Sequence, residues 1–344
     1  MSDSTSQRKI EHIRIIETDQ EADRRKYYFD DIRLMHRALP EVALDDVDPS
    51  VTFMKKRLSF PLLISSMTGG EHDLIRSVNE NLARAAEATG VAMGVGSQRV
   101  MFTHPAARAS FALREWAPTA LLFSNLGAVQ LNHGFTAAMC KEAVDVVGAD
   151  ALYLHLNPLQ EAVQPEGDTN FAGLSSRIAE AVSSLDKPVV VKEVGAGISP
   201  QDADLLIEAG VRYIDVAGTG GLSWSRIEHH RHNNNANGSG LGILFQDWGI
   251  PTPLALELLA PFRERVTLIA SGGVRSGMDM VKAMILGASL CGVASPFLKP
   301  AMESADRVVE VIERLKREFC TAMFLLGARR IDDIFDNRDL ILNR

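Results

Sequence analysis

Short apolar runs alternate with amphipathic stretches along most of the chain from about residue 60 onward. The apolar runs are rich in Val, Ile, Leu and Ala, as expected for strands buried on both faces of a parallel sheet. Polar residues and glycines end each run. The predicted strands are 61–67, 91–98, 120–127, 151–157, 189–195, 213–218, 266–274 and 289–297.

Amphipathic stretches that separate these runs have the spacing of helices that pack one face on a sheet. They span 75–89, 105–116, 136–147, 174–185, 200–209, 253–261 and 277–286, and a longer one spans 303–326. Regular βα alternation predicts a parallel sheet of the α/β class, and eight units favour a closed (β/α)8 TIM barrel. An open doubly wound sheet is the alternative, but no G-x-G-x-x-G follows the first strand.

Two segments do not follow this alternation of strands and helices. Residues 1–58 are polar and charged, so we expect an N-terminal extension that precedes a barrel over 59–344. The second segment, E-H-H-R-H-N-N-N-A-N-G-S-G-L-G at 228–242, has too few apolar residues for a core and predicts a mobile loop that covers the barrel mouth. His229, His230 and His232 suggest a metal only weakly, because no cysteine or carboxylate was identified as their partner.

Composition narrows the function classes. The 344 residues carry a formal net charge of −8, which argues against a broad nucleic-acid surface. The three cysteines form no C-x-x-C pair, which fits a reducing compartment. No N-terminal apolar segment resembles a secretory signal, and no apolar run is long enough for a membrane span. We therefore expect a cytoplasmic protein.

The ends of the predicted strands carry the candidate chemistry, because barrel enzymes place their active sites there. The seventh strand ends in S-G-G-V-R-S-G (271–277) and leads into a helix. Glycines let an anion approach the backbone, and a helix start offers free N–H groups. This pattern favours a phosphate-bearing cofactor, with Arg275 adding charge, although a tight turn would have the same glycines.

Lys192 lies inside the valine-rich run V-V-V-K-E-V-G (189–195). A buried ammonium needs an anion or loses its proton. One interpretation is a structural ion pair with a neighbouring carboxylate. The other is a lysine at the end of a strand that faces an anionic cofactor or substrate.

Strand four ends in H-L-N-P-L-Q-E (155–161), where His155 and Asn157 share one face. Such a concentration of polar groups is hard to bury without a function, although His155 alone would suit a satisfied core position. Glu161 is a candidate ligand for Mg²⁺, which often bridges to substrate phosphates, or a solvated loop carboxylate. Arg99 could hold an anion or form a surface ion pair.

These motifs together resemble the flavin-dependent type 2 isopentenyl diphosphate isomerases. The resemblance covers about residues 8–330 and rests on R-K-I-E-H (8–12), M-T-G-G (67–70), G-S-Q-R (96–99), the 155–161 and 191–195 motifs, and 271–277. It implies a (β/α)8 barrel that binds FMN and Mg²⁺ and needs reduced flavin, commonly supplied by NADPH. The implied reaction interconverts isopentenyl and dimethylallyl diphosphate with no net redox change, in a homo-oligomer that is usually a tetramer or octamer.

The resemblance also implies roles for individual residues. Lys192 would lie near the N1 and C2 oxygen of the flavin, and Glu161 would bind Mg²⁺. Gln160, His155 and Lys192 would serve catalysis. The implied FMN contacts are Ser66, Met67, Thr68, Ser97, Asn125, Lys192, Thr219, Gly272, Gly273, Arg275, Ala294 and Ser295. The implied substrate contacts are Arg8, Lys9, Ser97, Gln98, Arg99, His155, Asn157 and Gln160.

One departure concerns the sixth strand, where the family often has G-G-T and this chain has Leu222, so that Thr219 or Ser223 would replace the flavin-contacting threonine. Three other readings remain open. A 2-hydroxy-acid oxidoreductase would need a histidine after a late strand, where none stands. An IMP dehydrogenase-like enzyme would need a cysteine in a glycine-rich loop, which is also missing. A barrel that binds flavin without catalysis is the third.

Overall fold

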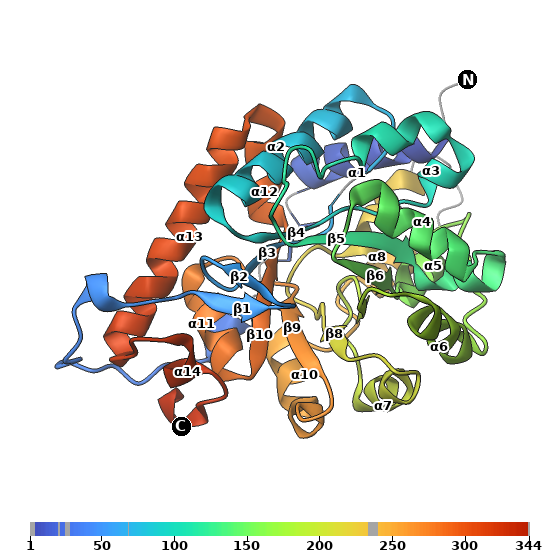
Figure 1. Cartoon of the computed structure of the whole chain (residues 1–344). Helices are drawn as coiled ribbons and strands as arrows, with labels where there is room; N and C mark the ends of the chain where they lie inside the picture. The colour runs from blue at the N-terminus through green and yellow to red at the C-terminus, as the bar shows by residue number, and fades with distance from the viewer. Residues whose placement is uncertain (1–3, 20, 25–27, 68, 233–239, 343–344) are drawn as a thin grey trace.

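Eight parallel strands form a closed barrel in the computed structural model, which describes residues 4–19, 21–24, 28–67, 69–232 and 240–342. The strands pair in chain order, and the last closes the ring on the first (Figure 1). All eight predicted strands and the TIM-barrel class are confirmed. The strands are β3 (Leu62–Ile64), β4 (Ala92–Gly94), β5 (Leu122–Gly127), β6 (Ala151–His155), β7 (Val189–Lys192), β8 (Tyr213–Asp215), β9 (Thr267–Ser271) and β10 (Ala288–Val293).

Helices surround this barrel (Figure 1). The principal ones are α2 (Asp73–Thr89), α4 (Ala137–Val147), α6 (Leu174–Ser184), α7 (Pro200–Glu208), α10 (Thr252–Leu258), α11 (Gly277–Ile285), α12 (Ser295–Glu303) and α13 (Ala305–Leu326). Shorter elements are α3 (Val100–Thr103), α5 (Pro158–Val163), α14 (Ile331–Ile334) and the 3₁₀ turns η1 (Phe29–Asp31), η2 (Leu44–Asp46), η3 (Pro105–Ser110), η4 (Ala128–His133), η5 (Ala260–Phe262) and η6 (Arg338–Leu340).

Two predicted helices need correction. The stretch 105–116 forms only the 3₁₀ turn η3, which begins at Pro105 without a side-chain cap and ends at Ser110, as 3₁₀ geometry is seldom sustained over many residues. The stretch 303–326 is divided, since Ser304 leaves the helical conformation and caps α13 by accepting from the backbone N–H of Arg307. Among the residues that the structure describes, no helix has the length and apolarity needed to cross a membrane.

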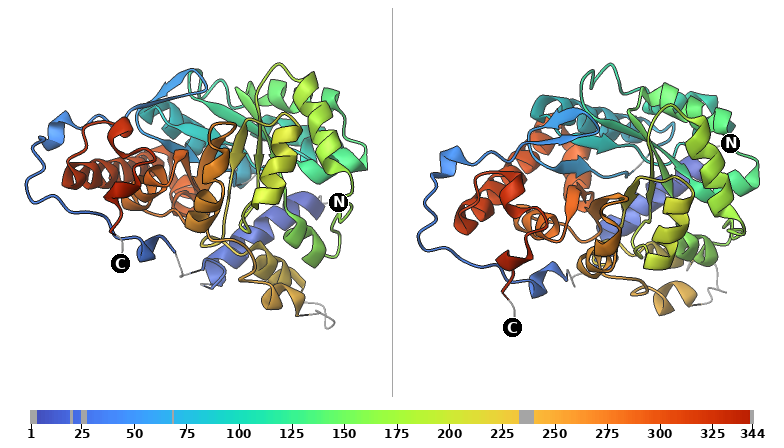
Figure 2. Two further views of the ribbon diagram at one scale, coloured as in Figure 1. Left: turned by 90° about the horizontal axis from the view of Figure 1, so that it is seen from below. Right: turned by 60° about the horizontal axis from the view of Figure 1, so that its bottom comes forward.

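The N-terminal extension reaches both ends of the barrel. Helix α1 (Ser4–Thr18) packs against α8 (Trp224–His232) beside the barrel mouth (Figure 2). Strands β1 (Val51–Phe53) and β2 (Lys56–Leu58) form an antiparallel hairpin whose Phe53 and Leu58 join the apolar core inside the barrel. The expected extension therefore also closes the opposite end of the barrel.

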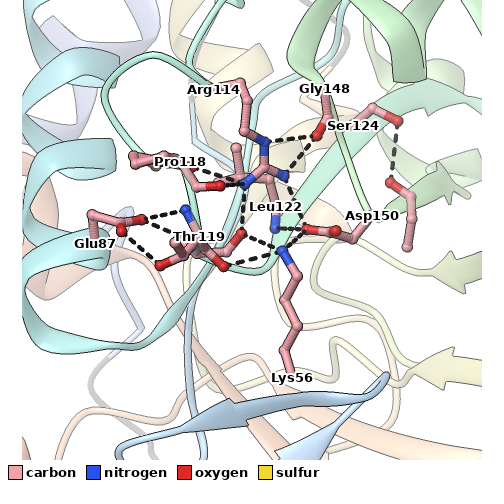
Figure 3. A network of polar contacts seen from close by, with 12 residues as sticks. Lys56, Glu87, Arg114, Pro118, Thr119, Leu122, Ser124, Gly148 and Asp150 are labelled. Carbon is pink, nitrogen blue, oxygen red and sulfur yellow. Dashed lines mark hydrogen bonds and ion pairs between the residues drawn. The ribbon is translucent and has the colours of Figure 1, made fainter.

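Lys56 of this hairpin belongs to a polar network at the N-terminal ends of β5 and β6 (Figure 3). Its ammonium donates to the Asp150 carboxylate at 2.8 Å and to the carbonyls of Thr119 and Ala120 at 3.1 and 3.0 Å. Arg114 donates to the same carboxylate at 3.0 Å. The half-buried ion pairs thus tie the hairpin to the barrel.

The prediction of a loop over 228–242 is wrong in its first part. Residues 228–232 complete helix α8, and 241–244 form a short helix, α9 (Leu241–Leu244), while residues 233–239 lie outside the described part of the chain. His230 pairs with the Asp19 carboxylate at 2.9 Å. No cluster of metal-ligating side chains occurs among the described residues. Residues 228–232 thus belong to a helix that packs against α1 beside the barrel mouth.

Candidate active site

A cavity opens at the C-terminal ends of the barrel strands, where the sequence places its candidate residues. The structure brings together Ser66, Met67, Ser97, Arg99, Asn125, His155, Asn157, Gln160, Glu161, Lys192, Gly272, Gly273, Arg275, Ala294 and Ser295 as lining residues. Thr68 lies outside the described residues, and so do the side chains of Arg8 and Lys9, whose backbone is part of α1. The assigned ligand contacts stay predictions.

Two predicted residues do not line the cavity. Gln98 is fully buried, where its Nε2 donates to the Ala143 carbonyl at 2.9 Å and its Oε1 accepts from the Asn125 backbone N–H at 2.9 Å. The predicted substrate contact by Gln98 is therefore replaced by a structural role. Thr219 is also buried away from the cavity, and its backbone N–H donates to the Ile250 carbonyl. At the end of β8 the cavity is lined instead by Gly221 and Leu222.

The loop after β9 forms a close-packed backbone turn at the cavity. Gly272 and Gly273 have φ of 89° and 76°, a conformation that favours glycine. A Cβ on Gly272 would lie 2.1 Å from the Gly218 carbonyl oxygen, so only glycine fits. Ser276 caps the following helix α11 with a capping box. The glycines thus let this loop pack on the loop after β8, and its place on the cavity before α11 keeps it the candidate phosphate site.

Lys192, the last residue of β7, lies in the cavity wall with its ammonium donating to the Glu193 carbonyl at 2.5 Å. Beneath it, the fully buried Asp215 accepts from Ser271 Oγ at 2.6 Å and from the Tyr153 hydroxyl at 3.2 Å. Burial raises the pKa of Asp215, and the Lys192 charge opposes this effect. Lys192 thus lines the cavity with buried carboxylates in its neighbourhood, and its contact with an anionic cofactor stays a prediction.

Glu193 follows Lys192 and turns away from the barrel axis. Its Oε2 accepts from three consecutive backbone N–H groups, those of Val194, Gly195 and Ala196. Burial raises the pKa of Glu193 to about 7, against the opposing effect of these hydrogen bonds and the Lys192 charge. Glu193 therefore fixes the loop that carries Gly195 to the cavity rim.

His155 has one ring nitrogen fixed by a neighbouring strand. Its Nδ1 lies 2.7 Å from Asn125 Oδ1, and Asn125 Nδ2 donates to the Val95 carbonyl at 3.0 Å. Because this second bond orients the Asn125 amide, its oxygen must accept, so His155 carries a proton on Nδ1. The ring is thereby held in one orientation at the cavity wall.

Glu161, in the first turn of α5, is a buried carboxylate on the cavity. Its oxygens accept from Asn157 Nδ2 at 2.7 Å, Gln164 Nε2 at 2.6 Å and the Asp168 backbone N–H at 2.7 Å. Asn157 Oδ1 and Gln164 Oε1 are buried without a hydrogen-bond partner in the described part of the chain. One carboxylate with amide oxygens nearby fits a Mg²⁺ ion held mainly by substrate phosphates.

Glu228 of α8 was not predicted as a site residue. Its carboxylate accepts from Gln160 Nε2 at 2.8 Å, lies 3.2 Å from His12 Nε2 and pairs with Arg231. Burial alone would raise the pKa of Glu228, but the bond and charge of His12 and the charge of Arg231 outweigh it and lower the pKa to about 2. The sequence holds one sign of this helix, because the i, i+4 spacing of Trp224 and Glu228 places both residues on one helical face.

Ser65 and Ser66 test whether a flavin suits this cavity. Both side chains lie on its wall, and both hydroxyl oxygens are buried without a hydrogen-bond partner among the described residues. Buried hydroxyls normally find partners, so these two are consistent with a polar ligand such as the edge of an isoalloxazine ring. Together with the glycine turn after β9 and with Lys192, which also line the cavity, they fit FMN.

Comparisons with known proteins agree with this assignment. Residues 172–342 match the model of the FMN-dependent dehydrogenase family. The chain is 52% identical to the isopentenyl-diphosphate delta-isomerase of Hydrogenovibrio crunogenus over 99% of this chain and 100% of that protein. It is 53% identical to the isopentenyl-diphosphate delta-isomerase of Paracoccus zeaxanthinifaciens, over 97% of this chain and 96% of that one.

Solved structures of flavin enzymes show the same fold. A mandelate oxidase variant with an FMN adduct superposes with a TM-score of 0.63 at 20% identity, over 90% of this chain and 87% of that one. A flavocytochrome b2 variant gives a TM-score of 0.66 at 18% identity, over 99% and 80% of the two chains. At such identities the likeness establishes the barrel and says nothing of the substrate.

Proposed function

Because the chain belongs to the isopentenyl-diphosphate delta-isomerase family, we propose that it interconverts isopentenyl and dimethylallyl diphosphate with reduced FMN and Mg²⁺ and without net redox change. The observation that carries the proposal is the 52% identity over 99% of the chain. The cavity supports the proposal, because a glycine turn, a buried lysine and a buried carboxylate line it at one end of the barrel.

The cofactor would lie across the ends of β3, β7, β9 and β10. Gly272, Gly273 and Arg275 would hold its phosphate, together with Ala294 and Ser295 at the start of α12. Ser66 and Asn125 would bond its polar edge, and Lys192 would place a positive charge near N1 and the C2 oxygen. When bound and reduced, FMN would supply the acid–base chemistry of the proton transfer.

The substrate diphosphate would lie on the β6 side of the cavity. Arg99 is half-exposed there, and its guanidinium is held by Asp168 at 2.9 Å. His155 and Asn157 supply hydrogen-bonding groups, and Mg²⁺ on Glu161 would neutralise the phosphate charge. Binding energy at the diphosphate would fix the distant alkene relative to the proton donor.

The apolar tail would lie between α1 and α8. Ile13, Ile16, Leu222 and Trp224 line this part of the cavity. The His12 ring packs edge-on against Trp224 with centroids 5.2 Å apart. This wall would exclude water from an alkene that becomes cation-like when it is protonated.

Glu228 and Gln160 would act on the positive charge that develops on the substrate. The Gln160 amide is oriented at both ends, because its Nε2 donates to Glu228 and its Oε1 accepts from Asn157 at 3.2 Å. A neutral amide and a carboxylate of pKa about 2 are both weak bases. We therefore assign Glu228 to electrostatic stabilisation of the cation-like state and Gln160 to positioning.

The proposal has three further parts. The family resemblance implies NADPH as the reductant and a tetrameric or octameric assembly. The composition of the chain supports a cytoplasmic location.

The proposal is tested anaerobically with FMN, NADPH, Mg²⁺ and isopentenyl diphosphate. We expect dimethylallyl diphosphate with reduced FMN and none with oxidised FMN. Glu161→Ala should raise the Mg²⁺ concentration needed for half-maximal rate about tenfold or more, while Glu142→Gln, which removes a surface carboxylate paired with Arg108, should not. Oxidation of a 2-hydroxy acid without isomerisation would move the assignment to the oxidoreductase reading.

A further inference from the structure

Asp23 contacts the two side chains that are assigned to the cofactor phosphate. Its Oδ2 accepts from Ser295 Oγ at 3.0 Å, and its Oδ1 accepts from Arg275 Nη2. The same Arg275 nitrogen donates to the Arg24 carbonyl at 3.1 Å. Arg275 and Ser295 line the cavity beside the glycine turn after β9. The Asp23 carboxylate therefore lies at the edge of the proposed site for the cofactor phosphate.

The backbone around Asp23 is fixed to the loop after β8. The Ser223 N–H donates to the Ala22 carbonyl at 2.8 Å, and the Arg24 N–H donates to the Gly221 carbonyl at 3.2 Å. Asp23 and Leu222 face each other in this antiparallel bridge. Residues 22–24, which we call the strap, thus connect the loops that follow β8, β9 and β10.

A carboxylate and a phosphate monoester prefer the same donors, namely a guanidinium and a hydroxyl. Two anions on one arginine repel each other, and the repulsion is strong where water is partly excluded. The side chains of Arg275 and Asp23 are 19% and 32% exposed, so solvent screening is incomplete. Both anions cannot use Arg275 and Ser295 fully at once.

We propose that Asp23 competes with the FMN phosphate for Arg275 and Ser295, so that cofactor binding releases the strap from the end of β9. The inference rests on the proposed function only in that FMN binds at this site. Asp23 is then a residue that sets cofactor affinity. By thermodynamic reciprocity, whatever fixes the strap weakens FMN binding. Helix α1 ends at Thr18, shortly before the strap, and packs against α8. Release of the strap by FMN would therefore also affect the helix that lines the substrate side of the cavity.

Flavin binding to the full-length protein, freed of flavin by dialysis, tests the competition. FMN and riboflavin differ only in the phosphate, so riboflavin isolates the contribution of the anion. We expect Asp23→Asn to bind FMN about tenfold more tightly than the wild type, with riboflavin affinity unchanged. Asp30→Asn, an exposed aspartate seven residues along the same segment, is the matched control and should change neither affinity.

Tryptic cleavage after Arg24 gives a second measurement that does not depend on the variant. In the wild type, FMN should speed this cleavage and riboflavin should not. Unchanged or weaker FMN binding by Asp23→Asn would overturn the competition, because Asp23 would then orient Arg275 for the phosphate. Equal tightening for both flavins would also overturn it. Failure of the isomerase assay leaves these results interpretable, whereas binding of neither flavin would contradict both proposals.

Discussion

The two ends of the barrel solve the same problem of buried polar groups in opposite ways. At the N-terminal end, Lys56, Arg114 and Asp150 satisfy one another and nearby carbonyls (Figure 3). At the C-terminal end, hydroxyl oxygens of Ser65 and Ser66 are buried without a partner among the described residues. The network of Lys56, Arg114 and Asp150 is thus satisfied by protein groups, whereas the two serine hydroxyls are consistent with completion by a ligand.

Apolar side chains separate the two ends. Phe123 and Tyr153 stack with ring centroids 5.0 Å apart, and Val190, Ile269 and Leu290 pack around them inside the barrel. This layer isolates the two polar regions, so a change at one end should have little effect on the other. Substitutions at the N-terminal end should therefore change mainly stability, and substitutions at the C-terminal end should change mainly activity. Each substitution below tests this expectation.

Glu228→Gln should have the largest effect. It removes the buried charge that accepts from Gln160 on the cavity wall, so kcat should fall about 10³-fold while FMN stays bound. Steady-state rates and the flavin absorbance of the purified variant measure this. Glu166→Gln is the matched control, because Glu166 pairs with the same Arg231 at 2.8 Å, whereas the Glu228 carboxylate also accepts from Gln160 on the cavity wall at 2.8 Å. A wild-type rate for Glu228→Gln would remove Glu228 from the mechanism.

Glu193→Gln should change how stability depends on pH. The Glu193 carboxyl is protonated in the folded protein up to about pH 7 and ionised in the unfolded chain above about pH 4.5. The unfolded state therefore binds fewer protons in this window, and folding loses up to about 3 kcal/mol as pH rises through it. Urea unfolding at pH 5 and pH 7.5 should show a smaller loss in the variant. Equal losses in both proteins would contradict the raised pKa.

Lys192→Met should lower kcat about 10²-fold through the flavin. The loss of positive charge should weaken FMN binding and shift the reduced-flavin spectrum from the anionic toward the neutral form. Lys282→Met is the control, because Lys282 is equally buried but donates to the Phe29 carbonyl at 2.8 Å, away from the cavity. The control should lose stability and keep the spectrum. Full activity and flavin affinity in Lys192→Met would refute the assignment.

Asp150→Asn should lower the free energy of unfolding by about 2 kcal/mol at pH 7 without changing kcat. Burial raises the pKa of Asp150, but the hydrogen bond and charge of Lys56 outweigh it, so the pKa is lowered overall. The contribution of Asp150 to the free energy of unfolding is therefore present above the pKa of this carboxyl in the unfolded chain, and it is lost as pH falls below about 4. Denaturant titrations at pH 7 and pH 3 should show the difference shrinking in acid. A fall in kcat would show that the two ends are coupled.

The barrel could be predicted because each strand carries its own evidence. Lys192 is a charged residue within a run of valines, which is expected where a buried strand ends at a ligand site. The structure places this lysine on the cavity wall. His155 ends β6, and Asn157 and Glu161 follow it. We could therefore expect them to lie together, because the C-terminal ends of barrel strands all lie at one end of the barrel. These inferences used local sequence and the known geometry of parallel strands.

The remaining errors come from contacts that only the folded chain makes. Gln98 lies beyond β4, which ends at Gly94, so alternation no longer tells which way a side chain points. Glu228 stands among His and Asn residues that favour loops, and its helix is stabilised by packing on α1. Asp23 precedes a basic run and gives no sign of its contact with Arg275, 252 residues away.

Deuterium transfer tests the central claim most directly. The wild type and Glu228→Gln, each loaded with reduced FMN and Mg²⁺ under anaerobic conditions, would be given isopentenyl diphosphate in D₂O and followed by NMR. The account predicts deuterated dimethylallyl diphosphate from the wild type and about 10³-fold slower formation by the variant. Absence of product from FMN-loaded wild-type protein, or equal rates in the two proteins, would contradict it.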